Sequence, residues 1–352
     1  MEMDQPGIMV PEIYRLRVKI TTDHTKIDHH KWDEFVKNHP QGNVFQTPDM
    51  FGIYRKCPNL EPFVIMALDQ GDNPVGVLVA LIQYQYKGMM KKFSSRAIIW
   101  GGPLIADNYD EVLGPMMGNY EKFMSKKALY TEVRNLWDTE RYNKIFSSLN
   151  YKFIEHLNIH IDLSIPEDQL WKNLNSKRRN EIRKAYRNNV KFRVGNSISE
   201  LKESYNILKE VYQRAKLPLP LFQFWAIIYG GLNRHSKLHN FLAVKDGKII
   251  GCMLALSYKD TIYDYYAGAY SSYYKFHPND LLPWEVFKWG IKNHYKLFDF
   301  GGAGKPGEKY GVRDYKKKFG GVFVNFGRYY KVHNPMTYRV AIFSYKFLQR
   351  LK

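Results

Sequence analysis

The sequence predicts an α/β protein made of two similar domains, and three observations support that class. The chain has 352 residues, and a chain of this length typically forms about two domains. Apolar residues make up 45% and aromatic residues 16%, which is enough for large hydrophobic cores. Short apolar strands alternate with helical patterns, and the same order of elements occurs twice.

The first copy of this order begins with a predicted β-hairpin at 63–82, where two apolar stretches flank an Asp/Gly turn. "SSRAIIWGGPLI" (94–105) predicts a strand that ends in glycines. A helical stretch (109–127) and the strand "ALYTEVRNL" (128–136) follow. This copy therefore has the order hairpin, strand, helix, strand.

The second copy repeats the order with a hairpin at 241–256 and the strand "TIYDYYAGAY" (261–270). The helix "NDLLPWEVFKWGIKNH" (279–294) and the strand "YKLFDF" (295–300) complete it. Such units occur in any α/β protein. The second hairpin strands also align as "VGVLVAL" and "IGCMLAL", which favours an internal duplication.

Two helices between the copies have predicted starts. Ser164 with Glu167, and Ser197 with Glu200, have the spacing of a capping box.

The domain boundary is expected near residue 160, with one domain at 1–160 and the other at 161–352. The final segment, 322–352, is free to pack back on the first domain. In this segment Asn334 and Pro335 predict the cap and first residue of a tail helix.

The net charge of +19 is concentrated in two segments. Residues 171–193 hold nine Lys or Arg and one Glu, and residues 315–352 hold nine Lys or Arg and no acid. Concentrated basic surfaces indicate polyanionic partners such as phosphates, RNA or an anionic membrane face.

Several other classes are excluded by the sequence. Cys57 and Cys252 are the only cysteines and lack metal-type spacing, so neither a disulfide scaffold nor a zinc site is expected. The first 20 residues lack the apolar core of a secretory signal, and no stretch approaches 18 uncharged apolar residues. We therefore expect a cytoplasmic protein, with peripheral contact to an anionic membrane left open.

A glycine pattern at Gly302, Gly304 and Gly307 spells G-x-G-x-x-G. Pro306 lies within it, no amphipathic helix follows, and no acidic residue stands about 20 residues further on to bind a ribose. The pattern is therefore interpreted as a glycine-rich loop and not as a dinucleotide site.

The segment "NSKRRNEIRKAYRNNV" predicts a basic helix on which Arg179, Arg183 and Arg187 form one stripe. Guanidinium groups suit phosphates, but a solvated face is an equally good interpretation. The predicted inward face is formed by Ile182, Ala185 and Tyr186.

The strand "YDYYAGAY" offers tyrosines that either bind substrate or pack. Strict alternation puts Tyr263 and Tyr265 on one sheet face, and Asp264 and Tyr266 on the other. No H-E-x-x-H or G-x-S-x-G motif occurs. An enzyme with this sequence is expected to act by positioning and electrostatic stabilisation.

Three segments in this order resemble the FemABX family of aminoacyltransferases. They are "GNVFQTPDMFGIYRK", "LWKNLNSKRRNEIRKAYRNNV", and "LLPWEVFKWGIKNHYKLFDFGG" followed by "GVRDYKKKFGG". The resemblance spans roughly residues 42–321. It implies tandem GNAT-like domains, each with a mixed β-sheet flanked by helices.

The resemblance also implies a reaction. Family members move an aminoacyl group from charged tRNA to an amine of a UDP- or lipid-linked peptidoglycan-precursor peptide, with no cofactor and no metal. Such a reaction needs a cation near the developing oxyanion and basic surfaces for phosphate and RNA.

Residue by residue, the resemblance implies catalytic roles for Lys316, as oxyanion stabiliser, and its neighbour Tyr315. It implies that Lys56 contacts the precursor's phosphate and that Tyr265 or Tyr266 lies at the site. The other residues expected to bind substrate are Arg179, Arg183, Arg214 and Asp299.

The sequence also departs from the family. Arg214 is the only cation in the place of an Arg–Tyr pair, and Glu132 is the nearest acid where relatives often carry Asp-Pro. One alternative is an acyl-CoA-dependent GNAT N-acyltransferase, although "YSSYYKFHPNDLL" lacks the glycines of a CoA loop. Another is a non-catalytic basic protein that binds RNA or a membrane surface.

Overall fold

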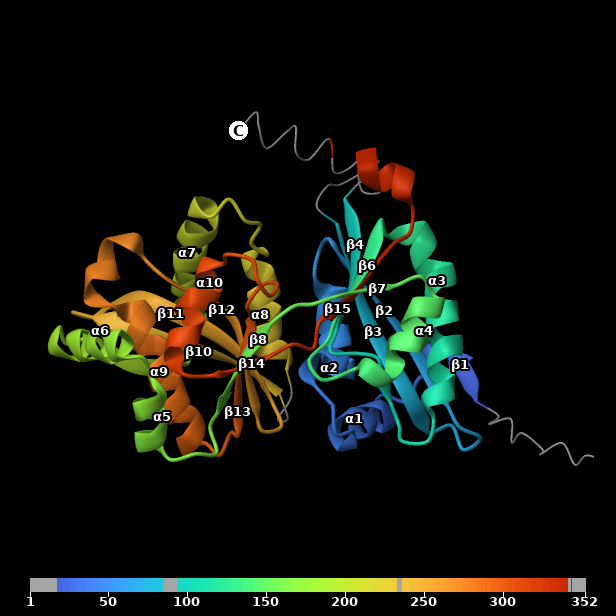
Figure 1. Ribbon diagram of the computed structural model, residues 1–352, viewed down its shortest axis with the longest axis horizontal. Coiled ribbons are helices and arrows are strands. Elements are labelled where there is room, and N and C mark those ends of the chain that lie inside the picture. Colours follow the sequence, from blue (N-terminus) through green and yellow to red (C-terminus); the bar gives the residue numbers. More distant parts are fainter. Residues whose placement is uncertain (1–17, 85–93, 233–235, 341–342, 344–352) are drawn as a thin grey trace, which may run out of the picture.

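The computed structural model describes residues 18–84, 94–232, 236–340 and 343. Two mixed β-sheets with helices around them lie side by side (Figure 1), which confirms the predicted α/β class. The expectation about a secretory signal rests mainly on residues 1–17, which lie outside the described residues, as does most of the chain after residue 340.

The first sheet has the strand order β1-β2-β3-β4-β6-β15-β7, and β5 also pairs with β3. Its strands are β1 (Lys19–Thr21), β2 (Leu60–Leu68), β3 (Pro74–Tyr84), β4 (Ser95–Trp100), β5 (Leu104–Ile105), β6 (Tyr130–Arg134), β7 (Lys152–Ile154) and β15 (Arg328–Val332). Its α-helices are α1 (His29–Asn38), α2 (Pro48–Lys56), α3 (Leu113–Lys127) and α4 (Asn143–Ser148).

The second sheet has the order β14-β8-β13-β12-β11-β10-β9. Its strands are β8 (Asn158–Asp162), β9 (Lys191–Gly195), β10 (Ser236–Lys245), β11 (Lys248–Tyr258), β12 (Thr261–Ala269), β13 (Leu297–Gly302) and β14 (Val322–Val324). Its α-helices are α5 (Glu167–Asn173), α6 (Ser176–Arg187), α7 (Ile198–Arg214), α8 (Phe222–Gly231), α9 (Pro278–Lys292) and α10 (Gly311–Lys316).

The repeated order predicted from the sequence is confirmed in both halves. In the first, β2, β3 and β4 form an antiparallel meander, and α3 leads to β6, which pairs parallel to β4. In the second, β10, β11 and β12 form the meander, and α9 leads to β13, which pairs parallel to β12. The two halves therefore have the same local topology.

The chain crosses between the sheets twice. It passes from β7 to β8, and after β14 it returns to insert β15 between β6 and β7 of the first sheet. Asn325 joins the two crossings, because its side chain accepts from the His156 amide at 3.0 Å and donates to Glu155 Oε1 at 2.9 Å.

The helix caps agree with the sequence in two of three places. The capping box of Ser197 and Glu200 is present at the start of α7, and Asn334 Oδ1 accepts from the Thr337 amide at 3.0 Å, with Pro335 as first helical residue. The predicted box at Ser164 is wrong. Its hydroxyl donates instead to Asp162 Oδ1 at 2.5 Å, and α5 begins only after Pro166.

A shared hydrophobic cluster holds the domains together. Ile53 and Tyr54 on α2 are buried in the same cluster as Trp225 and Ile228 on α8. Two further clusters lie between the first sheet and α3, and between the second sheet and helices α6 and α9. Because the seam buries large apolar side chains, the hydrophobic effect fixes the relative placement of the two sheets.

Candidate active site

The candidate site lies where two parallel strands of the second sheet separate. The pairing of β12 with β13 ends at Tyr263 and Asp299. Just beyond, Gly301 has φ +68°, a left-handed conformation that glycine adopts without steric cost, and the register of β13 with β8 shifts between Asp299 and Gly302. In open α/β sheets, ligands bind in the crevice outside the carboxyl ends of the strands. We call this place the strand fork.

Lys316, the last residue of α10, brings a cation to the strand fork. Its Nζ donates to the carbonyl oxygen of Phe300 and, at 3.3 Å, to that of Gly302. Burial lowers the pKa of Lys316, while the carboxylates of Asp264 and Asp299 oppose that shift. An ammonium group has three donors, so one N–H remains for a ligand.

Two carboxylates at the strand fork have different surroundings. Asp299 is 4% exposed and accepts from the Gly301 amide at 2.7 Å, with His160 Nε2 at 3.6 Å from its Oδ1. Asp264 is half-buried, and no described residue donates a hydrogen bond to its carboxylate. Burial raises the pKa of Asp264 to about 6, against the effect of Lys316 and with a contribution from Asp299.

Tyr315 makes contacts with α6 and α9. Its hydroxyl donates to the carbonyl oxygen of Asn279 at 2.6 Å, and its ring lies 4.8 Å from the guanidinium carbon of Arg178. Arg178 is 7% exposed and forms an ion pair with Asp280. These contacts attach α10 to α6 and α9, so Tyr315 supports the segment that carries Lys316.

Tyr265 and Tyr266 lie together on the side of α7 and α8. Their ring centroids are 5.7 and 4.6 Å from that of Trp225. The prediction that Tyr266 faces the opposite side from Tyr265 is therefore wrong. A β-bulge is the reason: Leu254 pairs with Tyr266 and Ala255 with Asp264, which leaves Tyr265 as an extra residue.

Two aromatic side chains of the first domain, Phe45 and Trp100, stack on each other, and Phe45 lies next to the tyrosines of β12. The ring of Phe45 lies 5.8 Å from that of Tyr263 and 6.2 Å from that of Tyr265. Trp100 stacks on Phe45 at 5.3 Å, and the guanidinium of Arg134 lies 4.5 Å from the Trp100 ring centroid.

The first domain also brings a cluster of charges to the strand fork. The carboxylate of Glu132 lies between Arg134 Nη2, at 2.8 Å, and the guanidinium of Arg328. Burial by itself would raise the pKa of Glu132, but the two arginines outweigh it and lower the pKa to about 2. A Cβ placed on Gly302 would stand 3.6 Å from Arg328 Nη2. This cluster therefore reaches the same loop that holds Lys316.

The other predicted binding residues, Arg179, Arg183, Arg214 and Lys56, make no contact with the residues of the strand fork in the described part of the chain. Arg179 donates to the carbonyls of Lys172 and Leu174 at 2.9 and 2.7 Å, which caps the end of α5. Arg183 lies exposed over the ring of Trp171 at 5.4 Å, on a helix at the outer side of the second domain (Figure 1). Arg214 pairs with Glu210 and with the Tyr274 hydroxyl, and Lys56 is exposed at the end of α2.

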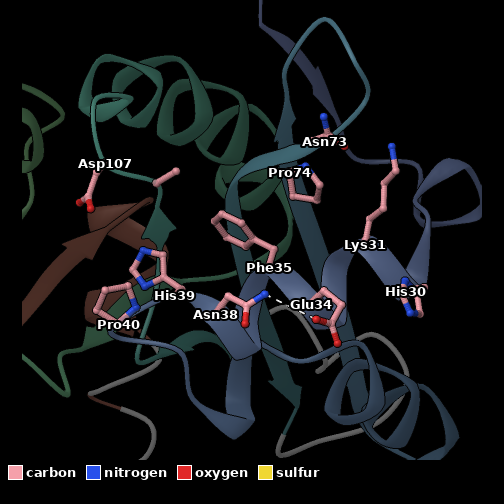
Figure 2. A pocket seen from close by; sticks show the side chains of 11 residues that line it. His30, Lys31, Glu34, Phe35, Asn38, His39, Pro40, Asn73, Pro74 and Asp107 are labelled. Carbon is pink, nitrogen blue, oxygen red and sulfur yellow. Dashed lines mark hydrogen bonds between the residues drawn. The ribbon is translucent and has the colours of Figure 1, made fainter.

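A separate hollow of about 490 Å³ lies in the first domain, beside α1 (Figure 2). His39, at its edge, binds the Ile105 carbonyl through Nε2 at 2.8 Å, and its own carbonyl accepts from Lys259 Nζ at 2.6 Å. These contacts are structural, and no functional role follows from them.

Among the described residues, no three His, Cys, Asp or Glu side chains gather closely enough to hold a metal ion. In the same part of the chain, no helix has the length and apolar character needed to cross a membrane.

Comparisons with known proteins agree with this architecture. Residues 175–317 match the family described as Acetyltransferase (GNAT) domain. A stretch of 130 residues is 26% identical to UDP-N-acetylmuramoylpentapeptide-lysine N(6)-alanyltransferase of Weissella viridescens, and covers 36% of this chain and 37% of that relative. The chain therefore aligns over about a third of the relative's length.

Two solved structures are similar over nearly the whole chain. The crystal structure of FemX matches with a TM-score of 0.70 at 14% identity, covering 92% of this chain and 99% of that one. A tandem GNAT protein from the clavulanic acid biosynthesis pathway matches with a TM-score of 0.56 at 10% identity, covering 90% and 99%.

Two mixed sheets in one chain, with a strand fork in the second, define a tandem GNAT-like fold, and the second sheet and its helices contain most of the residues that match the GNAT acetyltransferase family. Within that fold, the chain resembles FemX over nearly its whole length, and it resembles the alanyltransferase of Weissella viridescens over about a third of it.

Several site residues could not be chosen from the sequence. Arg178 is one position from the predicted stripe, and its burial depends on Asp280, which follows about 100 residues later. For Arg328 the sequence showed only that it belongs to the basic C-terminal segment, and gave no reason to choose it as a site residue. The alternation of β12 predicts the sheet face of Asp264, but it does not indicate that Lys316, 52 residues later, lies near it.

Proposed function

We propose that this protein is an aminoacyltransferase that moves an aminoacyl group from charged tRNA to an amine of a peptidoglycan-precursor peptide. The observation that carries the proposal is the Lys316 ammonium, held at the strand fork by two main-chain carbonyls with one N–H left over. The alanyltransferase relative, which acts on a UDP-N-acetylmuramoylpentapeptide lysine, supports the substrate class.

The chemistry is attack of an amine on an activated ester. The carbonyl oxygen gains negative charge in the tetrahedral transition state, and the free N–H of Lys316 suits that oxygen. Removing one such donor typically costs about 3 kcal/mol of transition-state stabilisation. A cation that is already fixed by Phe300 and Gly302 needs little reorganisation during the reaction.

The exposed basic surface around α6 is the proposed contact for tRNA. Its exposed cations are Lys177, Arg183, Lys184, Arg187, Lys191 and Arg193. Lys56 is the proposed contact for the precursor's phosphate groups, as the family resemblance implies. Because charged tRNA is a cytoplasmic substrate, the reaction is assigned to the cytoplasm.

The donor is tested by incubating the pure protein with a UDP-linked murein precursor and either charged tRNA or labelled acetyl-CoA. Mass spectrometry of the precursor reports the mass added. Addition of an aminoacyl mass from tRNA is the expected result. Transfer from acetyl-CoA alone would overturn the proposal and favour an acyl-CoA-dependent N-acyltransferase, and no transfer from either donor would contradict both.

A further inference from the structure

Asp264 occupies a special position on β12. It is the first residue after the last pair that β12 makes with β13, while on its other side β12 still pairs with β11 through Ala255. Its main chain lies close to the bend in β13, since a Cβ on Gly301 would stand 3.8 Å from the Asp264 carbonyl oxygen. Asp264 therefore stands where the pairing of the two parallel strands ends.

The charged and titratable groups around Asp264 come from three packed elements. Lys316 and Tyr315 come from α10, Asp299 from β13 and Tyr212 from α7. Only Lys316 among them is a cation, and its Nζ is already engaged by two carbonyls. No described residue pairs directly with the Asp264 carboxylate, so it is open to a ligand that enters the strand fork.

The carboxylates of the other two acids near the strand fork already accept hydrogen bonds from the protein. Asp299 is buried and accepts from the Gly301 amide at 2.7 Å. Glu132 is held between the guanidiniums of Arg134 and Arg328. A carboxylate that takes a proton from a substrate needs a lone pair that is not already used, and of these three acids Asp264 is the one whose carboxylate accepts no hydrogen bond from a described residue.

We propose that Asp264 is the general base that deprotonates the attacking amine, while Lys316 stabilises the oxyanion on the ester carbonyl. This inference rests on the proposed function. The C–N bond forms as Asp264 takes a proton from the nitrogen, and the ester C–O bond breaks as that proton passes to the leaving ribose oxygen. An amine and an ester thus become an amide and an alcohol, with the carboxylate regenerated.

The electrostatics of the site agree with this role. Burial raises the pKa of Asp264 to about 6, against the effect of Lys316 and with a contribution from Asp299. A general base works best when its pKa lies near the operating pH. Below that pKa the carboxyl is protonated and cannot accept, so the rate is expected to rise as pH increases through about 6.

The test measures kcat and KM of the full chain as a function of pH for wild type, Asp264→Asn and Asp264→Glu. Asp314→Asn on the exposed side of α10 is the matched control, because it removes a carboxylate two residues from Lys316. Asp264→Asn is expected to lose about 100-fold or more in kcat at neutral pH, with KM little changed. The residual kcat of Asp264→Asn is expected not to increase with pH near 6. Asp264→Glu is expected to restore part of kcat and its increase with pH.

A second acceptor separates a base from a merely structural residue. An aminooxy analogue of the acceptor has a more acidic nitrogen in the tetrahedral intermediate, and loses its proton to water without help. The defect of Asp264→Asn is expected to shrink at least tenfold with this analogue. Equal defects with both acceptors would assign Asp264 a structural role and overturn the inference.

The outcomes also separate this inference from the proposed function. If wild type transfers an aminoacyl group and Asp264→Asn keeps its full rate and pH profile, only the role of Asp264 fails. If wild type transfers nothing from charged tRNA, the proposed function fails first.

Discussion

Arg134 on β6 and Arg328 on β15 are direct register partners across an antiparallel strand pair, and the carboxylate of Glu132 lies between their guanidiniums. Like charges directly opposite each other destabilise a sheet. The pair is tolerated because Glu132 accepts from both arginines. Since Arg328 also reaches the loop at Gly302, this cluster couples the insertion of the C-terminal strand to the geometry of the strand fork.

Glu132→Gln is expected to destabilise the protein at pH 7 by roughly 3 kcal/mol, because it removes the charge that holds two arginines together. Folding lowers the pKa of Glu132 from 4.5 to about 2. This contribution to stability is therefore present above pH 4.5 and is lost as pH falls toward 2. Urea unfolding of both proteins at neutral and acidic pH measures it.

The exposed Glu111→Gln is the control for that experiment. It is expected to leave the free energy of unfolding unchanged at either pH. A difference between wild type and Glu132→Gln that stays the same from pH 7 down to pH 2.5 would contradict the assignment.

Lys316→Ala is expected to lower kcat about 100- to 1000-fold, the usual effect of removing one oxyanion donor, while KM changes little. The neighbouring Lys317→Ala is the control, because Lys317 is exposed and pairs with Asp314 at 3.2 Å. Steady-state kinetics with charged tRNA and precursor measure kcat and KM of both variants. An unchanged kcat in Lys316→Ala would remove Lys316 from the site.

Arg178→Ala is expected to destabilise the second domain by about 3 kcal/mol or more, since it leaves Asp280 without its buried partner. It also removes the cation that lies against Tyr315 and Phe319. Urea unfolding measures the effect, with the exposed Arg187→Ala on the same helix as control. Equal stability of the two variants would show that this ion pair does not hold α10 in place.

The triple variant Arg183→Glu, Arg187→Glu, Lys191→Glu is expected to weaken tRNA binding at all salt concentrations. Its plot of log affinity against log salt should be shallower by about one unit per lost phosphate contact. Filter binding across a salt series measures this, with the exposed Lys209→Glu, Lys216→Glu on and just after α7 as control. A larger loss in the control than in the triple variant would place the RNA elsewhere.

Local patterns made much of the fold predictable. The hairpins, the helix after each third strand and the parallel strand that follows depend on apolar periodicity within short windows, and all of them are present in both halves. Ile182 and Ala185 are buried as the helical spacing predicts. Tyr186 is 41% exposed instead, because its hydroxyl is engaged by Glu285 at the surface.

Predictions from local patterns were wrong where a single neighbouring residue changed a hydrogen bond or the strand register. At Ser164 the nearby Asp162 captures the hydroxyl that would have capped α5. At Tyr266 a single extra residue shifts the side-chain alternation, so the tyrosine joins Tyr265 against Trp225. Neither the competing hydrogen bond nor the bulge has a distinct sequence pattern.

The sequence by itself determined the two copies, their order of elements and the position of Lys316 near the end of the second. Only the tertiary structure decided that Lys316, Asp264 and Arg328 meet around one loop. Arg328 reaches that loop because the chain returns to the first sheet after β14. Such meetings depend on strand pairing and burial between distant segments, which local periodicity does not encode.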